Sequence, residues 1–213
     1  MEVQVDKSIY NFSDYVKEER WCSYYNQIKE ILESNAKEVI LIGVGDGIVK
    51  EVVNIIAPST RIITVDFDSE LKPDICCDIL ELTKYFDNKV DLVVCCQVLE
   101  HIPYDYFFKA LYEIKSILKD DGKLVLSLPD GGLEIAGNIK IPTFPVKKWG
   151  RRYCRFYKKD FVFNGEHYWE INGAKKYSLH KIKKDIMKYF IVNRNYSVKY
   201  NTYHHFFICK TIE

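Results

Sequence analysis

Three glycines at alternate positions form the first stretch whose residue types could bind a ligand. Gly43, Gly45 and Gly47 follow the apolar run Val39–Ile42, and the chain then resumes with apolar residues at helical spacing from Ile48 to Ile56. This pattern predicts a buried strand, a tight turn and a helix, the unit on which open α/β sheets bind nucleotides. Glycine lets the backbone turn sharply and approach a ligand closely, and a helix N-terminus offers that ligand unpaired N–H groups.

A carboxylate nineteen residues further on strengthens this interpretation. The second apolar run, 61–65, ends in Asp66. A carboxylate at the end of the second strand can accept both hydroxyls of an adenosine ribose. Together the turn and Asp66 predict an adenosine-containing cofactor.

The glycine spacing discriminates between cofactors. The dinucleotide fingerprint is G-x-G-x-x-G, whereas this chain has G-x-G-x-G, and a phosphate-binding P-loop sequence is missing. With Asp66, this turn resembles the first two motifs of the class I S-adenosylmethionine-dependent methyltransferases. Two further segments, Gln97–Pro103 ("QVLEHIP") and Leu124–Pro129, also resemble that family, so the resemblance spans roughly residues 36–130.

The resemblance implies a set of cofactor ligands. It comprises Gly43, Gly45, Asp46, Gly47, Asp66, Phe67, Asp78, Ile79, Cys96 and Gln97. Asp78 and Ile79 match an acidic–apolar pair that contacts the adenine edge in the family, although Asp78 could instead merely cap the following turn. Many family members also carry an acidic residue two positions before the first glycine, where it helps to bind the methionine end of the cofactor. Leu41 stands there, so either cofactor binding is weaker or another group takes that role.

Histidines are the candidate proton acceptors, because methyl transfer needs a base only when the acceptor must lose a proton, and histidine titrates near neutrality. His167 ranks first, since Gly165–Glu170 resembles a segment that faces the reaction chamber in many family members. His101 ranks second, with Glu100 beside it directly after the predicted fourth strand. The alternatives are a surface histidine at 167 and a packing or capping role for His101.

A metal site is the other interpretation of these residues. Gln97, Glu100, His101 and His167 resemble the set that holds Mg²⁺ in small-RNA 2′-O-methyltransferases, but Gln97 replaces an anionic ligand. Hard cations prefer several charged oxygen ligands, so we expect no metal here. His204 and His205 are adjacent in a predicted strand and point to opposite faces, which favours structural roles for both.

The resemblance implies one methyltransferase domain over residues 1–213. It also implies an α/β fold, a Rossmann-like three-layer sandwich whose mostly parallel seven-stranded sheet ends in a C-terminal antiparallel hairpin, and the two β-rich runs near the C-terminus fit that hairpin. Its parts are an N-terminal helix (1–35), the cofactor-binding core (36–130), an acceptor-region insertion (131–176), and the last helix and edge strands (177–213). The N-terminal helix, with Ser13 as its predicted N-cap, would pack on the sheet or form a lid; packing is favoured.

Composition narrows the partners. The formal net charge is +1, and the N-terminus has no signal-peptide pattern and no apolar run long enough to span a membrane, so a cytoplasmic location is expected. The seven cysteines contain no C-x-x-C, which removes support for a zinc ribbon. Within 147–159, seven residues are basic and four aromatic, which suits a phosphorylated acceptor, although a solvated basic loop balanced by acidic segments elsewhere is the commoner case. Nucleic acid is less favoured because the rest of the chain is not basic.

The sequence therefore predicts S-adenosylmethionine-dependent methyl transfer to oxygen or nitrogen of a small-molecule acceptor, with sugar-linked and phosphorylated compounds among the candidates. The alternatives are an RNA methyltransferase, an NAD-binding oxidoreductase and a non-catalytic methyltransferase-like binding protein. Neither the acceptor nor the oligomeric state follows from the sequence.

Overall fold

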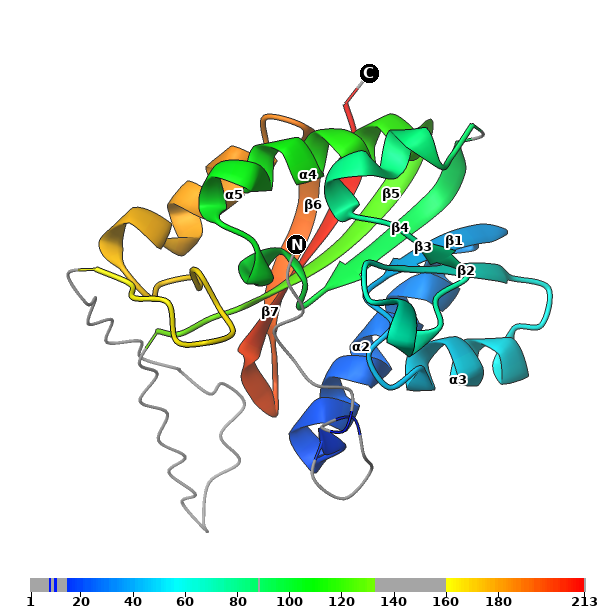
Figure 1. The fold of residues 1–213 in the computed structure, drawn as a ribbon, viewed down its shortest axis with the longest axis horizontal. Helices are drawn as coiled ribbons and strands as arrows, with labels where there is room; N and C mark the ends of the chain where they lie inside the picture. Colours follow the sequence, from blue (N-terminus) through cyan, green and yellow to red (C-terminus); the bar gives the residue numbers. More distant parts are fainter. Residues whose placement is uncertain (1–7, 9, 11–14, 88, 133–159, 213) are drawn as a thin grey trace, which may run out of the picture.

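The fold is a seven-stranded sheet between two layers of helices, seen in a computed structural model that describes residues 8, 10, 15–87, 89–132 and 160–212. The strands lie in the order β3-β2-β1-β4-β5-β7-β6 (Figure 1). Strands β1 to β5 are parallel to their neighbours, and β7 pairs antiparallel with both β5 and β6. The predicted fold class, including the antiparallel C-terminal hairpin, is confirmed.

The strands and helices have the following bounds. The strands are β1 (Glu38–Ile42), β2 (Arg61–Asp66), β3 (Ile75–Cys76), β4 (Val90–Cys96), β5 (Leu118–Pro129), β6 (Phe190–Val198) and β7 (Asn201–Thr211). The α-helices are α2 (Glu18–Ser34), α3 (Ile48–Ile56), α4 (Tyr104–Ile117) and α5 (Leu179–Ile186). Short 3₁₀ helices are η2 (Ser69–Leu71), η3 (Ile79–Lys84), η4 (Leu99–His101) and η5 (Lys175–Tyr177).

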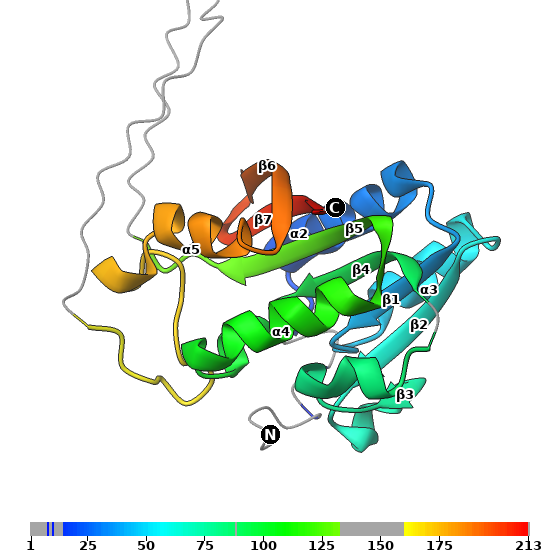
Figure 2. The ribbon, with the colours of Figure 1, turned by 90° about the horizontal axis from the view of Figure 1, so that it is seen from above.

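Alternation along the buried strands divides the core into two layers. In β1, Ile40 and Ile42 pack into the layer covered by α4 and α5, whereas Val39 and Leu41 pack into the layer covered by α2 and α3. Successive side chains of a strand point to opposite faces of the sheet. The strand is apolar throughout because helices cover both faces (Figure 2).

Helix α2 is held to the sheet by polar contacts as well as apolar ones. Glu30, 4% exposed, accepts a hydrogen bond of 2.7 Å from Tyr196 of β6 and pairs with Arg194. Tyr24 donates to Asp46 in the glycine turn, and Ser23 contacts His204 of β7. The expected packing role of this helix is therefore seen, although one of its faces also lines a cavity.

Several predicted boundaries were wrong. Helix α2 begins at Glu18, later than predicted, and the predicted cap Ser13 lies outside the described residues. The sequence of residues 74–80 predicts one short strand, but only Ile75–Cys76 forms a strand, because η3 begins at Ile79. The sequence also predicts a turn at 120–123 and a hairpin turn at 201–202; the first segment is part of β5, and the hairpin turn lies earlier, at 199–200.

Two predicted features cannot be followed in the structure. Most of the insertion, 133–159, lies outside the described residues, and with it the whole basic and aromatic segment 147–159. Of the insertion, only residues 131–132 and 160–176 are described. Among the described helices, none combines the length and apolar character needed to cross a membrane.

Candidate functional site

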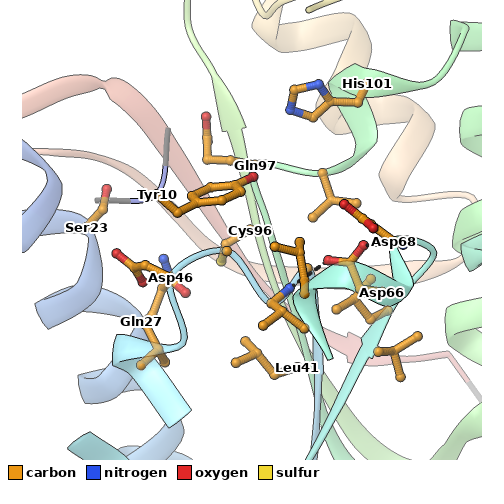
Figure 3. A pocket seen from close by; sticks show the side chains of 18 of the residues that line it. Tyr10, Ser23, Gln27, Leu41, Asp46, Asp66, Asp68, Cys96, Gln97 and His101 are labelled. Atoms are coloured by element: carbon orange, nitrogen blue, oxygen red, sulfur yellow. Dashed lines mark hydrogen bonds between the residues drawn. The ribbon is translucent and has the colours of Figure 1, made fainter. Parts of the chain in front are cut away.

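A cavity lies where the carboxyl ends of β1, β2 and β4 meet, the edge at which open α/β sheets bind ligands. Eight of the predicted cofactor ligands line it: Gly43, Gly45, Asp46, Asp66, Phe67, Ile79, Cys96 and Gln97. Gly47 and Asp78 are not among its lining residues. These eight residues come from four separate segments of the chain, and Figure 3 shows several of them around the cavity.

Gly43 shows why glycine is needed after β1. Its φ is +88°, and a Cβ there would come within 2.7 Å of Val98 Cγ2. Its N–H donates to the carbonyl of Val65 at 2.8 Å, which ties the turn to β2. Both the backbone conformation and the close approach of Val98 therefore exclude a larger side chain.

Asp66 fixes the other wall of the same cavity. Its Oδ2 accepts the N–H of Val44 at 2.9 Å, and its Oδ1 accepts the N–H of Asp68 at 3.0 Å. These bonds orient the carboxylate against the glycine turn. Each carboxylate oxygen can accept a second hydrogen bond, so the group retains the capacity to bind two ribose hydroxyls.

Asp78 takes the capping position that the sequence left open as an alternative. Its Oδ1 accepts the N–H of Leu80 at 2.8 Å at the start of η3. The neighbouring Ile79, 3% exposed, presents its apolar side chain to the cavity. Of the predicted adenine-contacting pair, only Ile79 therefore lines the cavity.

The N-terminal segment supplies cavity residues that the sequence analysis missed. They are Tyr10, Tyr15, Arg20, Ser23, Tyr24 and Gln27. The Arg20 guanidinium lies over the Tyr15 ring, 3.9 Å from its centroid. The helical pattern of α2 predicted its buried face, but no motif showed that part of this face meets the glycine turn.

A second cavity of about 420 Å³ adjoins the first. The residues that line both cavities are Tyr10, Tyr15, Arg20, Gln97, His101 and His204. Glu100, Glu166, His167 and Tyr203 line the second cavity alone. A ligand in the first cavity can therefore face one in the second.

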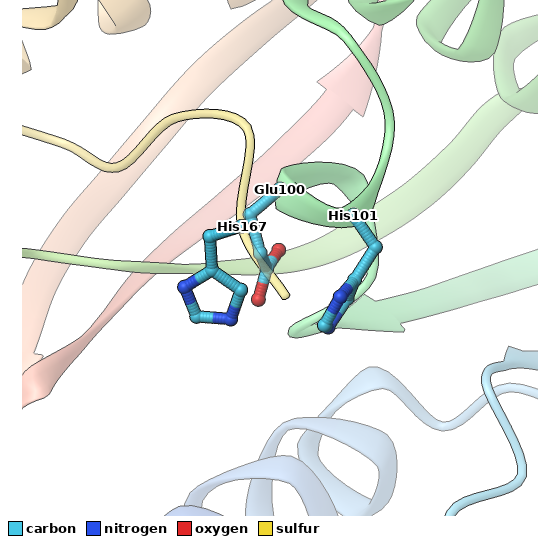
Figure 4. Close-up of side chains that lie close together, drawn as sticks. All are labelled: Glu100, His101 and His167. Atoms are coloured by element: carbon cyan, nitrogen blue, oxygen red, sulfur yellow. The ribbon is translucent and has the colours of Figure 1, made fainter. Parts of the chain in front are cut away.

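The three predicted catalytic side chains meet in this second cavity. Glu100 and His101 lie in η4, which follows β4, and His167 comes from the described end of the insertion. Their potential ligand atoms lie within 4.8 Å of one another, and the Glu100 carboxylate lies between the two rings (Figure 4). The rings of His101 and His167 are 4.9 Å apart, centroid to centroid.

The carboxyl group of Glu100 is fully buried. It is 0% exposed, and neither carboxylate oxygen has a hydrogen-bond partner within the described part of the chain. Burial raises the pKa of Glu100 to about 7, while the charge of His167 opposes and that of Glu170 adds to the shift. A carboxylate buried in this way is stabilised by binding a proton or a cation.

His167 is positioned by a carboxylate and a phenol. Its Nδ1 lies 2.9 Å from Glu170 Oε1, which also accepts the hydroxyl of Tyr203 at 2.7 Å. Burial lowers the pKa of His167, but the Glu170 hydrogen bond and the charge of Glu100 outweigh it, so the pKa is raised. Burial and the charge of His167 lower the pKa of His101, which makes His167 the stronger base.

The histidine pair of β7 divides between two environments. His205 contacts Ser197 and Asn195 of β6 at 3.0 and 3.2 Å, in agreement with the expected structural role. His204 contacts Ser23 and lines both cavities, a position that the sequence analysis missed. Burial, with the charges of Arg20 and His167, lowers the pKa of His204 to about 3, which keeps the ring neutral.

Comparison with known proteins agrees with this geometry. Residues 40–126 match the family model of a methyltransferase domain. The fold is similar to that of the N-methyltransferase NodS from Bradyrhizobium japonicum in complex with S-adenosyl-L-homocysteine, with a TM-score of 0.61 and 13% identity over 99% of this chain and 95% of that one. None of the curated protein sequences matches the chain.

Two more solved structures share the fold. One is the Burkholderia thailandensis 1,6-didemethyltoxoflavin-N1-methyltransferase, with a TM-score of 0.61 and 14% identity over 97% of this chain and 85% of that one. The other is an S-adenosylmethionine-dependent methyltransferase from Clostridium acetobutylicum, with a TM-score of 0.60 and 17% identity over 97% of both chains.

Residues 40–126 thus match a methyltransferase domain, and the sheet, the glycine turn and Asp66 have the arrangement expected of the class I S-adenosylmethionine-dependent methyltransferases. The cofactor expected from the sequence is S-adenosylmethionine. The eight predicted ligands that line the first cavity fit this group: Asp66 suits the ribose, Ile79 an apolar base edge, and the glycine backbone a closely approaching chain. Leu41 lines the same cavity, without the carboxylate that many family members carry there.

Proposed function

We propose that this enzyme methylates an oxygen or nitrogen of a small molecule held in the second cavity. The observation that carries the proposal is the junction of the two cavities at Gln97, His101 and His204. A cofactor in the first cavity would direct its methyl group toward an acceptor in the second. A volume of about 420 Å³ suits a small molecule.

The chemistry asked of the protein is mainly positioning. The acceptor's lone pair forms a bond to the methyl carbon as the carbon–sulfur bond breaks, which leaves S-adenosylhomocysteine. Holding the two reactants in line at contact distance supplies much of the rate gain. An acceptor that carries a hydroxyl or protonated amine must also lose a proton.

We propose that His167 Nε2 accepts that proton when no metal ion is bound to the protein. Nδ1 of this ring lies against Glu170, so the imidazolium formed by proton transfer has a carboxylate beside it. His101, whose pKa is lowered, is the second candidate. Both rings line the second cavity.

The second cavity is lined by both basic and acidic residues, so it favours no particular charge on the methyl acceptor. Lys17 and Arg20 line the second cavity and would contact a phosphorylated acceptor, but Glu19 and Glu166 line it too. The two neighbours named above as N-methyltransferases support a nitrogen acceptor by analogy. An RNA acceptor is the second candidate, supported only by the composition of 147–159.

Thermal unfolding with S-adenosylhomocysteine, with NAD and with neither is the first test. A ligand that binds only the native state at about 100 times its Kd adds about 2.7 kcal/mol. For a chain of this length the Tm should rise by roughly 5–10 °C. A rise with NAD but not with S-adenosylhomocysteine would contradict the proposal; the expected rise leads to methyl-transfer assays against panels of small amines, alcohols and short RNAs.

A further inference from the structure

The group formed by Glu100, His101 and His167 has the composition of a metal site. It offers one carboxylate and two imidazoles, all within 4.8 Å of one another. Glu100 and His101 are fixed by η4, while His167 arrives from a segment 66 residues further along the chain. The group therefore forms only in the folded protein.

The burial of Glu100 is the first argument for a cation. Both of its oxygens lie in a fully buried carboxyl group without a hydrogen bond from the described chain. Leaving such a charge unpaired is costly. A proton would remove the charge but leave one oxygen without a partner, whereas a divalent ion between the carboxylate and the rings would neutralise the charge and bind the carboxylate directly.

The second argument is the way the two rings are held. His167 directs Nδ1 to Glu170 at 2.9 Å, and His101 directs Nδ1 to the carbonyl of Glu166 at 3.0 Å. A metal-binding histidine characteristically bonds its second ring nitrogen to a carboxylate or a carbonyl, which fixes the tautomer and the ring orientation. Both rings show this arrangement, and both thereby assign ligation to Nε2.

We propose that Glu100, His101 and His167 bind one divalent transition-metal ion, such as Zn²⁺, Co²⁺ or Mn²⁺. Two nitrogens and one oxygen suit these ions better than Mg²⁺, which prefers oxygen ligands. Ligand atoms around a tetrahedral ion with bonds near 2.1 Å lie about 3.4 Å apart, so side-chain shifts of about 1 Å close the site. Three protein ligands leave at least one position open toward the second cavity.

Gln97 no longer argues against this site. The sequence-based expectation of no metal rested on the missing carboxylate at that position. In the structure, Gln97 Nε2 donates to Ser127 Oγ at 3.2 Å, and the three remaining ligands suffice. A site without Gln97 also differs in ligand type from an all-oxygen Mg²⁺ site.

An ion at the junction of the cavities would act on the acceptor. A hydroxyl coordinated to it loses its proton more readily, and His101 and His167 then serve as ligands and not as bases. This consequence rests on the proposed function, whereas ion binding itself does not. The two can therefore fail separately.

The test is a titration of the chelator-treated full-length protein with Co²⁺, followed by its visible absorption, and competition by Zn²⁺. We expect one Co²⁺ per chain, absorption bands of nitrogen and oxygen coordination, and displacement by Zn²⁺ but not by equimolar Mg²⁺. Glu100→Gln keeps the shape of the side chain and should weaken binding at least tenfold. His167→Ala should do the same and serves as the second variant if Glu100→Gln does not fold.

His180→Ala is the matched control, because His180 is exposed on α5 and lies outside the group. Equal affinity in Glu100→Gln, His167→Ala and His180→Ala would mean an adventitious ion only and would overturn the proposal. The Tm shift of the ion-free wild-type protein with S-adenosylhomocysteine is measured in parallel. A normal shift without specific Co²⁺ binding rejects the metal site alone; specific Co²⁺ binding without that shift rejects the cofactor assignment alone.

Discussion

The two adjoining cavities are built in different ways. The predicted cofactor ligands that line the first cavity lie in short segments at or after the ends of strands, and the glycine turn among them is held to β2 by the N–H groups of Gly43 and Val44. The second gathers titratable side chains from η4, the end of the insertion and β7. The predicted cofactor ligands can therefore be found from local sequence patterns, whereas the candidate catalytic side chains come together only through contacts between distant segments.

Removing the proton acceptor should cause the largest effect. If His167 takes up the proton that the substrate loses, His167→Ala should lower kcat by about 10²- to 10⁴-fold in the absence of added metal ion. Single-turnover rates with the acceptor found by screening would measure this, with His180→Ala as the control. An unchanged rate would mean that the second cavity works by positioning alone.

The pH dependence sharpens this assignment. Because Glu170 raises the pKa of His167, kcat/KM should rise with pH up to that pKa and then level off. In Glu170→Gln the inflection should move to lower pH, since the neutral amide no longer favours the imidazolium. An inflection at the same pH in the wild type and in Glu170→Gln would show that it does not arise from the titration of His167.

Removing Asp66 should be the next largest effect, this time in the first cavity. Each charge-assisted hydrogen bond contributes about 1.5–3 kcal/mol, so losing two ribose contacts in Asp66→Ala should weaken S-adenosylhomocysteine binding by about 100-fold or more. Calorimetric titration would measure it. Asp120→Asn provides the control, because its side chain is 92% exposed at the far end of β5; similar loss in both would refute the role of Asp66.

These effects also show what the sequence could predict. The strand–turn–helix unit and Asp66 depend on local pattern, so both could be predicted, whereas the strand at 74–80 and the turn at 120–123 were predicted wrongly. Ile79, Cys96 and Gln97 followed from the family resemblance, and they lie at or shortly after the ends of β3 and β4. The capping of η3 by Asp78 was foreseen only as an alternative, because one carboxylate suits both roles.

The second cavity was harder to predict. Glu100, His101 and His167 could be named, but their convergence, and the bonds that place Glu170 and Tyr203 behind His167, arise from packing between distant segments. No sequence pattern indicated that Arg20 or His204 lines a cavity. Arg20 lies in a helix whose apolar residues alone supported the prediction, and His204 lies in a strand beside His205, which has a structural role. Sequence periodicity says which face is buried but not what that face meets.

Gly43 and Gly45 distinguish the two costs of a side chain in the turn: the collision with neighbouring atoms and the strain of a positive φ. Both have positive φ, but a Cβ at Gly43 would collide with Val98 Cγ2, whereas nothing lies within 4 Å of one at Gly45. Gly45→Ala should therefore cost only the backbone strain, about 1–2 kcal/mol, and Gly43→Ala clearly more. Denaturant unfolding of both variants checks this, and Val98→Ala should recover part of the Gly43→Ala loss; equal costs would contradict the collision.

The smallest expected effect concerns His204, which borders both cavities. Its folded pKa of about 3 lies below the ordinary value of 6.5, so the native state binds fewer protons than the unfolded chain between these values. The free energy of unfolding should therefore fall as the pH drops below 6.5, by up to about 1.4 kcal/mol per pH unit from this group. Glu100 acts oppositely, because its raised pKa makes the native state less stable as pH rises from 4.5 to about 7. The observable is thus the difference between the wild type and His204→Gln in denaturant unfolding at pH 5 and 7: the variant should lose less stability on acidification, and an identical loss would show that His204 is protonated in the native state.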